Sequence, residues 1–422
     1  MFDVVVIGAG AAGLLAASRS AERGRRTLLV EKNRKPGVKI LISGGTRCNL
    51  THHCDARGII AAFGSSGSFL HSPLAALGPS ELVELFHAEG VPTKIEDTGK
   101  VFPESDRALD VAQALTWRAQ RCGATLALGE AVQRLERVDD RFHVHTSLRE
   151  LRCTRLLITT GGKSYPGCGT TGDGYAWLQA WGHTIRRPRP ALVPLISDDG
   201  WVRELSGITV PDTSLDVVDT REPTIAKPRT RRNVLPPGVM IRRRGSLLFT
   251  HFGLSGPVVL DVSRAVTGVA HPRDVRLHAD FLPDVTSAAL DDQLRVATAH
   301  DGKKQIICLL PELLPRRLAE TLLVQANIPA DRKGAEFSKS ERAALVRWIK
   351  SAEIRVTGSR GFDKAEVTAG GVSLDEVDSR TMQSKLVPNL YLAGEILDLD
   401  GFIGGYNFQA AFSTGWLAGS CV

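Results

Sequence analysis

The chain has 422 residues, 43% of them hydrophobic, so it is long enough to bury more than one core. Its net charge of +7 and pI near 9.1 suit an anionic partner without requiring one. The seven cysteines form no CxxC motif and no Cys/His cluster, which argues against a metal site or a disulfide framework and favours reduced thiols in a cytoplasm. No apolar run approaches the ~18–20 residues that span a bilayer, and MFDVVVIGAG lacks the basic start of a signal peptide.

The N-terminal segment has the pattern of a dinucleotide-binding βαβ unit. Residues 3–7 (DVVVI) predict a buried strand, residues 14–24 a helix, and residues 27–31 (TLLVE) a second strand. The glycine-rich fingerprint between the first strand and the helix comprises Gly8, Gly10, Ala11, Ala12 and Gly13. Because strand, turn, helix, strand and a final acid occur in order, the fingerprint predicts a bound dinucleotide.

Each residue of the fingerprint has a physical role. Gly8 permits the tight turn, Gly10 lets the backbone approach a pyrophosphate, and Gly13 allows close packing of helix on strand. The helix N-terminus adds amide donors and the positive end of its dipole. Glu31 lies where an acid binds ribose hydroxyls, which disfavours a 2′-phosphate and leaves an NAD-like nucleotide or FAD.

The next segment favours FAD over NAD. Small residues beside basic side chains suit contact with the pyrophosphate and ribityl oxygens of an extended FAD, although an ordinary polar loop has the same composition. The candidate FAD-binding residues here are Lys32, Lys39, Gly44, Gly45, Arg47, Cys48 and Asn49. Val132 and two residues of the strand and glycine turn LLITTGG, Thr160 and Gly161, complete the candidates from the middle of the chain.

The C-terminal segment returns to the same site. Residues 389–395 (NLYLAGE) predict a strand, followed by a glycine-rich loop and a helix from about Gln409. An AG-acid turn suits the ribityl chain, and a helix N-terminus beside the flavin stabilises negative charge on the reduced ring. The candidates are Gly394, Glu395, Gly405, Asn407 and Gln409. The alternative is a final helix that only packs against the domain.

Six ordered motifs resemble one family of flavoproteins. They are VVVIGAGAAGLLAA, KILISGGTRCNLTH, TTGGKSYPGCGTTGDGYAW, LLFTHFGLSGPVVLDVSR, VTAGGVSLDEVDSRTMQSK and YLAGEILDLDGFIGGYNFQAA. The chain is thereby similar, from residue 2 to about 419, to the BaiN/RdsA-like (YhiN-like, aminoacetone-oxidase-like) FAD-dependent flavoproteins. It departs from the family at Thr46, where a third glycine is more usual. The resemblance implies an α/β fold, a discontinuous doubly wound FAD-binding domain interrupted by a β-barrel-like plus helical insert.

The patterning predicts the boundaries of these parts. We expect the first part of the FAD-binding domain at 1–190, an insert at 191–353 and the second part at 354–422. Within the insert, 191–282 is β-rich with no long amphipathic helix, and 283–350 is helical, with helices over 291–300, 310–326 and 338–351. The Arg- and Pro-rich residues 186–195 predict a linker.

The chemistry follows from the flavin. The chain encodes no second dinucleotide-binding fold, so we expect NADH or NADPH to be a transient reductant without its own domain. The candidate catalytic groups are Cys48, Tyr165 and His251, although a lone cysteine in a tight loop and a histidine inside a barrel also serve as packing.

Three functions remain open. The resemblance favours reduction of an activated C=C bond, most specifically of uridine to dihydrouridine in ribosomal RNA. The alternatives are oxidation or reduction of a small metabolite (aminoacetone-type amine oxidation or steroid-type reduction) and a non-catalytic, flavin-containing RNA-binding factor. A basic stretch around the Pro-Pro-Gly turn at 236–238 is either a solvated loop or an RNA-binding rim. Its arginines are Arg221, Arg229, Arg231, Arg232, Arg242, Arg243 and Arg244.

Overall fold

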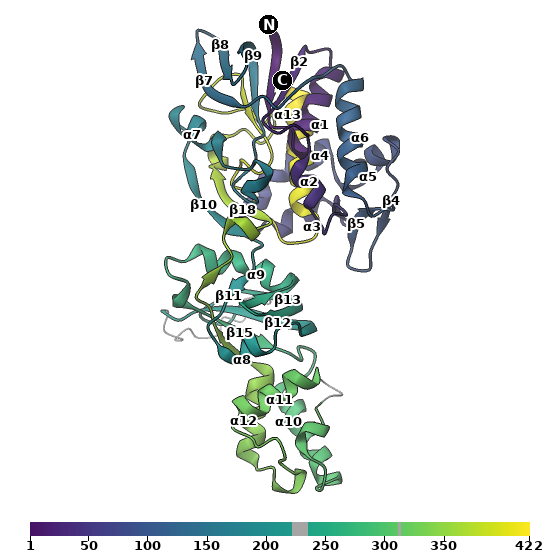
Figure 1. Ribbon diagram of the computed structural model, residues 1–422, viewed down its shortest axis with the longest axis vertical. Helices are drawn as coiled ribbons and strands as arrows, with labels where there is room; N and C mark the ends of the chain where they lie inside the picture. Colours follow the sequence, from purple (N-terminus) through teal and green to yellow (C-terminus); the bar gives the residue numbers. More distant parts are fainter. Residues whose placement is uncertain (222–234, 311–313) are drawn as a thin grey trace. The chain divides into compact units, whose positions relative to one another are not determined.

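The computed structural model describes residues 1–221, 235–310 and 314–422 (Figure 1). The chain divides into two compact units, which we call the nucleotide unit (residues 1–190 and 362–422) and the insert unit (residues 191–361). Among the described residues, every helix is too short or too polar to cross a lipid bilayer.

The nucleotide unit is built on a seven-stranded sheet in the order β6-β2-β1-β9-β8-β7, with β19 also beside β9. Its strands are β1 (Phe2–Ile7), β2 (Thr27–Glu31), β6 (Thr125–Leu128), β7 (Val132–Val138), β8 (Arg141–Thr146), β9 (Glu150–Ile158) and β19 (Leu390–Leu392). Strands β6, β2, β1, β9 and β19 are parallel, and β8 and β7 add an antiparallel hairpin. Residues 4–7 and 156–158 are buried, as expected of strands covered on both faces. The doubly wound α/β fold is confirmed.

The first and last helices of the chain lie side by side (Figure 1). A Cβ on Gly415 of α13 (Tyr406–Cys421) would lie 2.4 Å from the carbonyl oxygen of Ala12 in α1 (Ala11–Glu22). A Cβ on Gly419 would lie equally close to the carbonyl oxygen of Ala16. These two glycines therefore let the backbones of α1 and α13 touch, and both ends of the chain contribute to one core.

Shorter elements surround this core. They are α2 (Val38–Ile42), β3 (Thr51–His52), α3 (Ala56–Ala62), α4 (His71–Ala76), α5 (Pro79–Ala88), β4 (Thr93–Ile95), β5 (Lys100–Pro103), α6 (Ala108–Arg121), α7 (Asp173–Ala180), β10 (Ile185–Ala191) and β18 (Val367–Val372). The linker predicted from residue 186 is wrong at its start, because β10 pairs with β18 in a two-stranded sheet. Such a sheet has only edge strands, and these tolerate prolines without an N–H.

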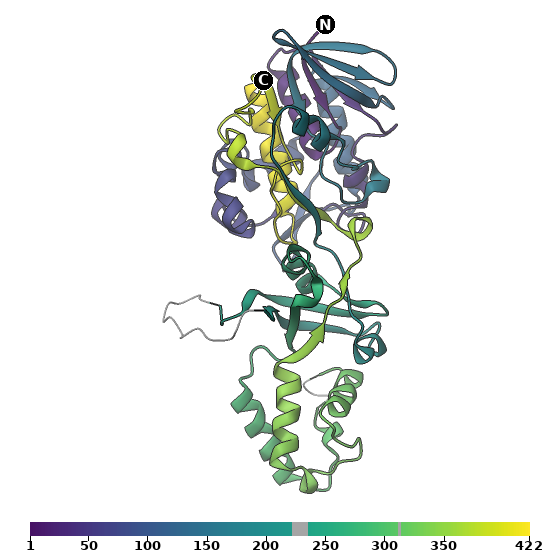
Figure 2. The ribbon, with the colours of Figure 1, turned by 90° about the vertical axis from the view of Figure 1, so that its left-hand side faces the viewer.

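The insert unit contains an antiparallel sheet in the order β16-β15-β12-β13-β14-β11-β17. Its strands are β11 (Leu195–Ile196), β12 (Thr209–Asp219), β13 (Val239–Thr250), β14 (Gly253–Ser255), β15 (Val275–Asp280), β16 (Ala352–Arg355) and β17 (Gly358–Ser359). Strands β12 and β13 are its longest members and pair along most of their length (Figure 2). The short α8 (Gly200–Glu204) also contacts β13.

The expectation of no long amphipathic helix among 192–280 is wrong. Helix α9 (Pro257–Gly268) packs on β12 and β13 and buries Val258, Val262 and Val266 at a spacing of four residues. Its β-branched residues resemble a strand in sequence, but Gly256 and Pro257 provide a helix start. The helices beyond the sheet are α10 (Ser287–His300), α11 (Arg316–Gln325) and α12 (Lys339–Lys350).

The residues just before each of these three helices explain where the helix begins. Thr286 accepts a hydrogen bond from the Ala289 amide, so α10 begins before the predicted residue 291. Ser338 and Glu341 form a capping box at α12. Helix α11 begins after Pro315, and residues 311–313 of the predicted 310–326 helix lie outside the described residues.

Candidate functional site

A pocket opens at the carboxyl ends of β1 and β2, where α1 begins. The following predicted cofactor-binding residues line it: Gly8, Gly10, Ala11, Ala12, Glu31, Lys32, Lys39, Val132, Thr160, Gly161, Gly394, Glu395 and Asn407. The pocket therefore brings together residues from both ends of the chain.

The fingerprint glycines differ in what surrounds them. A Cβ on Gly13 would lie 1.9 Å from the carbonyl oxygen of Gly8, and Gly8 itself has a φ of +101° with Thr159 behind it. A Cβ on Gly10 would meet no protein atom within 4 Å, because Gly10 faces the pocket. Gly8 and Gly13 thus serve the turn and the packing, and Gly10 leaves space for a ligand.

Glu31 is held by two backbone amides at the end of β2. Its Oε2 accepts a hydrogen bond from the Ala9 amide at 2.7 Å, and its Oε1 accepts one from the Asn33 amide at 2.8 Å. A carboxylate has about four acceptor sites, so lone pairs remain for hydroxyl donors. This arrangement suits the ribose of a nucleotide.

Lys39 and Glu395 meet across the pocket from positions 356 residues apart in the chain. The Lys39 Nζ donates to Glu395 Oε2 at 2.5 Å and to Ser164 Oγ at 2.6 Å. Glu395 Oε1 accepts from Ser164 Oγ at 2.8 Å and from the Thr368 amide at 2.7 Å. We call these four residues the Lys39 network. Its Ser164 and Thr368 were not singled out from the sequence, although Ser164 lies just after Gly161.

A second pair orders another part of the pocket wall. Lys32 Nζ donates to Asp173 Oδ2 and to Thr171 Oγ1, both at 2.6 Å. Asn33 Nδ2 donates to the Cys168 carbonyl at 3.0 Å. These bonds hold the 168–173 loop against the residues that follow β2. Asp173 is the first residue of α7, whose cap position is Gly172.

The SGGTRCN loop, residues 43–49, lies outside the pocket lining and has an unusual backbone. Gly44, Gly45, Thr46 and Cys48 all have positive φ, with Thr46 at 70° and Cys48 at 63°. A β-branched residue rarely adopts this conformation, so Thr46 is strained where a glycine would not be. The Ser43 carbonyl accepts from the Cys48 amide at 3.1 Å and closes the loop.

Two predicted cofactor-binding side chains, Arg47 in this loop and Gln409 in α13, contact other protein residues instead. Arg47 stacks over Phe102 at 4.0 Å from the ring centroid, and its Nη1 donates to Glu96 at 2.6 Å. Gln409 is buried within α13, where its Nε2 donates to the Leu77 carbonyl and to Ser413 Oγ. Neither side chain lines the pocket, because each is drawn into its own local contacts.

The start of α13 lies beside the pocket. In the orientation that satisfies both ends of its amide, Asn49 accepts from the Gly405 amide at 3.0 Å. Asn407 accepts from the Gly401 amide at 2.8 Å and so orders the loop before the helix. Helices α1 and α13 both begin at a glycine without a side-chain cap, which leaves amides and positive dipole ends for an anionic ligand.

These residues fit FAD. Gly10 leaves space at the N-terminus of α1, and Glu31 retains acceptor sites for a ribose. Among the described residues, the buried Thr160 Oγ1 has no hydrogen-bond partner, yet it lines the pocket. A buried hydroxyl of this kind is expected to bind a ligand or water.

The three candidate catalytic residues lie in different settings. Cys48 is fully buried, so its thiol cannot reach a substrate, and burial raises the pKa of the thiol to about 12. Tyr165 is half-buried in the nucleotide unit with a φ of 51°, and burial raises the pKa of its phenol. His251 is exposed in the insert unit, at the turn between β13 and β14.

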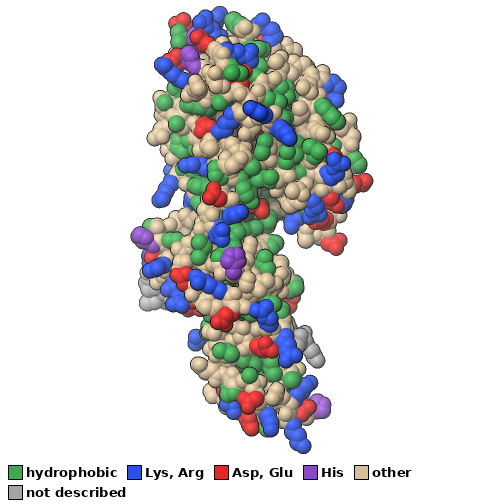
Figure 3. Space-filling view, viewed as in Figure 1, with side chains coloured by type: hydrophobic (Ala, Val, Ile, Leu, Met, Phe, Trp, Pro, Cys, Tyr) green, Lys and Arg blue, Asp and Glu red, His purple; other side chains and the backbone are tan. Residues whose placement is uncertain are grey.

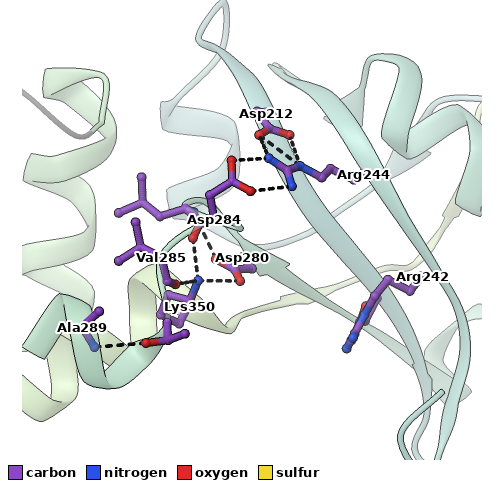
Figure 4. A network of polar contacts seen from close by, with 11 residues as sticks. Asp212, Arg242, Arg244, Asp280, Asp284, Val285, Ala289 and Lys350 are labelled. Carbon is purple, nitrogen blue, oxygen red and sulfur yellow. Dashed lines mark hydrogen bonds and ion pairs between the residues drawn. The ribbon is translucent and has the colours of Figure 1, made fainter. Parts of the chain in front are cut away.

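The described arginines of the predicted RNA-binding rim are paired with carboxylates. Arg242 donates to Asp216 at 2.5 Å. Arg244 lies between Asp212 and Asp284, at 2.5 Å from each (Figure 4). Arg243 pairs with Asp261, and Arg221 pairs with Asp219. Arg229, Arg231 and Arg232 lie outside the described residues. The described part of this rim is therefore compensated, and Figure 3 shows basic and acidic side chains side by side on the insert unit.

The fold and the pocket define a FAD-dependent oxidoreductase. The model of the HI0933-like protein Rossmann domain matches residues 2–421, and the chain belongs to this family. It is 32% identical over 418 residues to the ribosomal RNA dihydrouridine synthase of Escherichia coli K12 (98% of this chain, 96% of the relative). It is 31% identical over 420 residues to the protein of the same name from Haemophilus influenzae (98% and 96%). The 3-dehydro-bile acid delta(4,6)-reductase of Clostridium scindens is 30% identical over 426 residues (99% and 98%).

Proposed function

We propose that the protein reduces uridine to dihydrouridine in ribosomal RNA, with FAD as cofactor and NADH or NADPH as reductant. One observation carries the proposal. Relatives named for a ribosomal RNA nucleoside and for a bile acid share 30–32% identity with almost the whole chain. Both names describe reduction of a carbon–carbon double bond, so the reaction type is common to them although the substrates differ.

The proposed reaction balances with one reductant. In uridine, the C5=C6 bond is conjugated with the C4 carbonyl, so a hydride adds at C6 and a proton at C5. Uridine, NAD(P)H and one proton then give dihydrouridine and NAD(P)⁺. Bound FAD supplies the hydride transfer, and the protein supplies orientation and the proton.

The residues around the pocket have separate tasks in this proposal. Gly10 and the α1 N-terminus bind the pyrophosphate, and Glu31 binds the ribose next to the adenine. The Lys39 network fixes the Glu395 carboxylate, which would bind the ribityl hydroxyls. The uncapped start of α13 stabilises negative charge placed near it.

Tyr165 is our candidate for the proton donor. Its backbone is fixed by two bonds: its amide donates to the Phe362 carbonyl at 3.0 Å, and its carbonyl accepts from the Cys168 amide at 2.8 Å. The phenol is protonated at neutral pH, and burial raises its pKa further above the ordinary value of 10. A strained backbone held by its surroundings is a recurring property of functional residues.

RNA is favoured over a small enone on two grounds. The two relatives at 31–32% identity are named for ribosomal RNA, and the net charge of +7 suits a polyanion. A cytoplasmic location follows from that substrate. Reduction of a conjugated ketone of the bile-acid type is the second candidate, since the relative at 30% identity carries that name.

The test is nucleoside mass spectrometry of ribosomal RNA from cells with and without the gene. We expect dihydrouridine to disappear from one ribosomal RNA position on deletion and to return with the intact gene. Anaerobic mixing of the purified protein with NADH or NADPH should bleach the flavin band without a persistent complex. An unchanged dihydrouridine content would reject the RNA substrate and favour the enone.

A further inference from the structure

One group of side chains in the insert unit combines aromatic rings with an available cation. It consists of His251, Phe252 and Arg360, and we call it the His251 cluster. The Arg360 guanidinium lies 4.6 Å from the centroid of the Phe252 ring. The rings of His251 and Phe252 meet edge to face at a centroid distance of 5.0 Å. His251 is exposed, and the other two are half-buried.

The backbone beneath the cluster is fixed independently of these side chains. The Phe252 carbonyl accepts from the Ser197 amide at 3.0 Å, and the Arg360 amide donates to the Pro194 carbonyl at 3.0 Å. Gly253 has a φ of +146°, and a Cβ there would lie 2.4 Å from the Leu195 carbonyl oxygen. The turn is therefore held by backbone hydrogen bonds, which substitutions of the three side chains leave in place.

Arg360 differs from other arginines that lie over aromatic rings. Arg47 over Phe102 is paired with Glu96, and Arg118 over Trp416 is paired with Glu89. Phe102 is also 2% exposed, so that contact serves packing. Within the described parts of the chain, no carboxylate lies within ion-pair distance of Arg360. Its charge is thus uncompensated, unlike that of Arg242 and Arg244 on β13 (Figure 4).

We propose that the His251 cluster binds an unpaired nucleotide of RNA. The base stacks on the exposed ring of His251, which Phe252 holds edge to face, and the Arg360 guanidinium contacts the adjoining phosphate. Aromatic and guanidinium planes hold splayed-out bases in this way, and the arginine fork matches phosphate oxygens. The proposal rests on RNA being the substrate and specifies the surface that recognises it. The RNA contact then lies at the turn after β13 and does not use the ion-paired arginines of that strand.

The test uses a single-stranded RNA oligonucleotide with 2-aminopurine at one position, whose fluorescence falls on stacking. Binding is measured at several salt concentrations with flavin-loaded protein. We expect Phe252→Leu to weaken binding about tenfold and to abolish the quenching, and Phe252→Tyr to restore both. Arg360→Gln should weaken binding and lower the salt slope of log K by ~0.7.

Two matched variants serve as controls. Trp117→Leu removes another exposed aromatic ring, and Arg295→Gln removes an exposed arginine that is paired with Asp292. Both should bind RNA as the wild type does. Unchanged binding and quenching in Phe252→Leu would overturn the proposal, as would a wild type that binds no RNA.

The same samples separate this proposal from the proposed function. RNA binding that depends on Phe252 without any dihydrouridine would leave the cluster standing and reject the uridine reductase. If wild type and Phe252→Leu form dihydrouridine with the same KM for RNA, the uridine reductase would stand and the His251 cluster would be rejected as the RNA contact. Flavin content and thermal stability should be equal in all variants.

Discussion

The nucleotide pocket and the sheet of the insert unit use charged and polar groups in opposite ways. In the pocket, Gly10 faces open space, Thr160 has a buried hydroxyl without a partner among the described residues, and Glu31 retains acceptor sites. On the sheet, Arg242 and Arg244 are already paired with aspartates. Both regions are polar and contain ion pairs, but the pocket also holds the free acceptor sites of Glu31 and the Thr160 hydroxyl, unpaired within the described part of the chain.

Residue type alone is therefore a poor guide to ligand binding, because the partners of a side chain within the protein decide whether it is available. A run of arginines predicts an anion site, yet each described member here has a carboxylate that would have to be displaced. A glycine predicts little by itself, yet Gly10 faces the pocket with no protein atom where a side chain would be. Availability therefore decides which polar groups bind ligands.

The largest effect should separate two neighbouring glycines. Gly13→Ala places a Cβ 1.9 Å from a carbonyl oxygen, so the unfolding free energy should fall by about 2 kcal/mol or more and flavin should be lost. Gly10→Ala, at a φ of −83°, should keep the wild-type Tm and weaken FAD at least ~10-fold. Absorbance at the flavin band and thermal melts measure both. Equal Tm losses in the two variants would contradict the distinction.

Glu31→Gln tests whether FAD binding requires both side-chain oxygens of residue 31 to accept hydrogen bonds from backbone amides. Its two oxygens accept from the amides of Ala9 and Asn33, and a glutamine places an NH₂ group against one of those donors. We expect FAD affinity to fall by about 10–100-fold, because about 1.4–2.7 kcal/mol of hydrogen bonding is lost. Fluorescence of released FAD measures the change. Wild-type affinity would show that Glu31 is not a nucleotide ligand.

A buried ion pair should matter more than an exposed one. The Glu89 side chain is 4% exposed and pairs with Arg118 and Arg121, so Glu89→Ala should cost about 3 kcal/mol of unfolding free energy. Arg242→Gln, on the sheet, should cost about 1 kcal/mol or less. Urea titrations of both variants give the comparison. A larger loss of unfolding free energy in Arg242→Gln than in Glu89→Ala would contradict this expectation.

The same pair predicts a pH dependence. Burial raises the pKa of Glu89, but hydrogen bonds from Arg121 and Arg118 outweigh it and leave the pKa below the ordinary 4.5. A lowered folded-state pKa means that this stabilisation is present above about pH 4.5 and is lost as pH falls through the folded-state value. Glu89→Ala should therefore lose stability at pH 7 and less at pH 3. A constant loss across this range would contradict the assignment.

The smallest effect concerns Thr46. Replacing it with glycine removes a β-branched side chain from a φ of 70°, so Thr46→Gly should raise the unfolding free energy by about 1 kcal/mol. Its backbone carbonyl, which accepts from the Ala108 amide at 2.8 Å, is retained. Thermal melts measure the gain. A loss of stability would show that the threonine side chain has a compensating contact.

Local patterns in the sequence predicted the fold and the outline of the site. The GAGAAG turn and Glu31 lie within one βαβ unit, so their spacing fixes their placement. The meeting of Lys39 with Glu395 could not be predicted, because 356 residues separate them and both α1–α13 packing and β9–β19 pairing are needed. The aspartates that pair with Arg242 and Arg244 lie 26–40 residues away in the chain. The sequence alone therefore does not show that these arginines form ion pairs. The strain at Thr46 has no sequence signature of its own.

The most direct test of the central claim is a single reaction in vitro. Ribosomal RNA from cells that lack the gene is incubated anaerobically with the flavin-loaded protein and NADH or NADPH, and its nucleosides are analysed by mass spectrometry. We predict one dihydrouridine for each NAD(P)H consumed, at one ribosomal position. Reductant consumed without dihydrouridine, together with reduction of a conjugated steroid ketone by the same preparation, would contradict it.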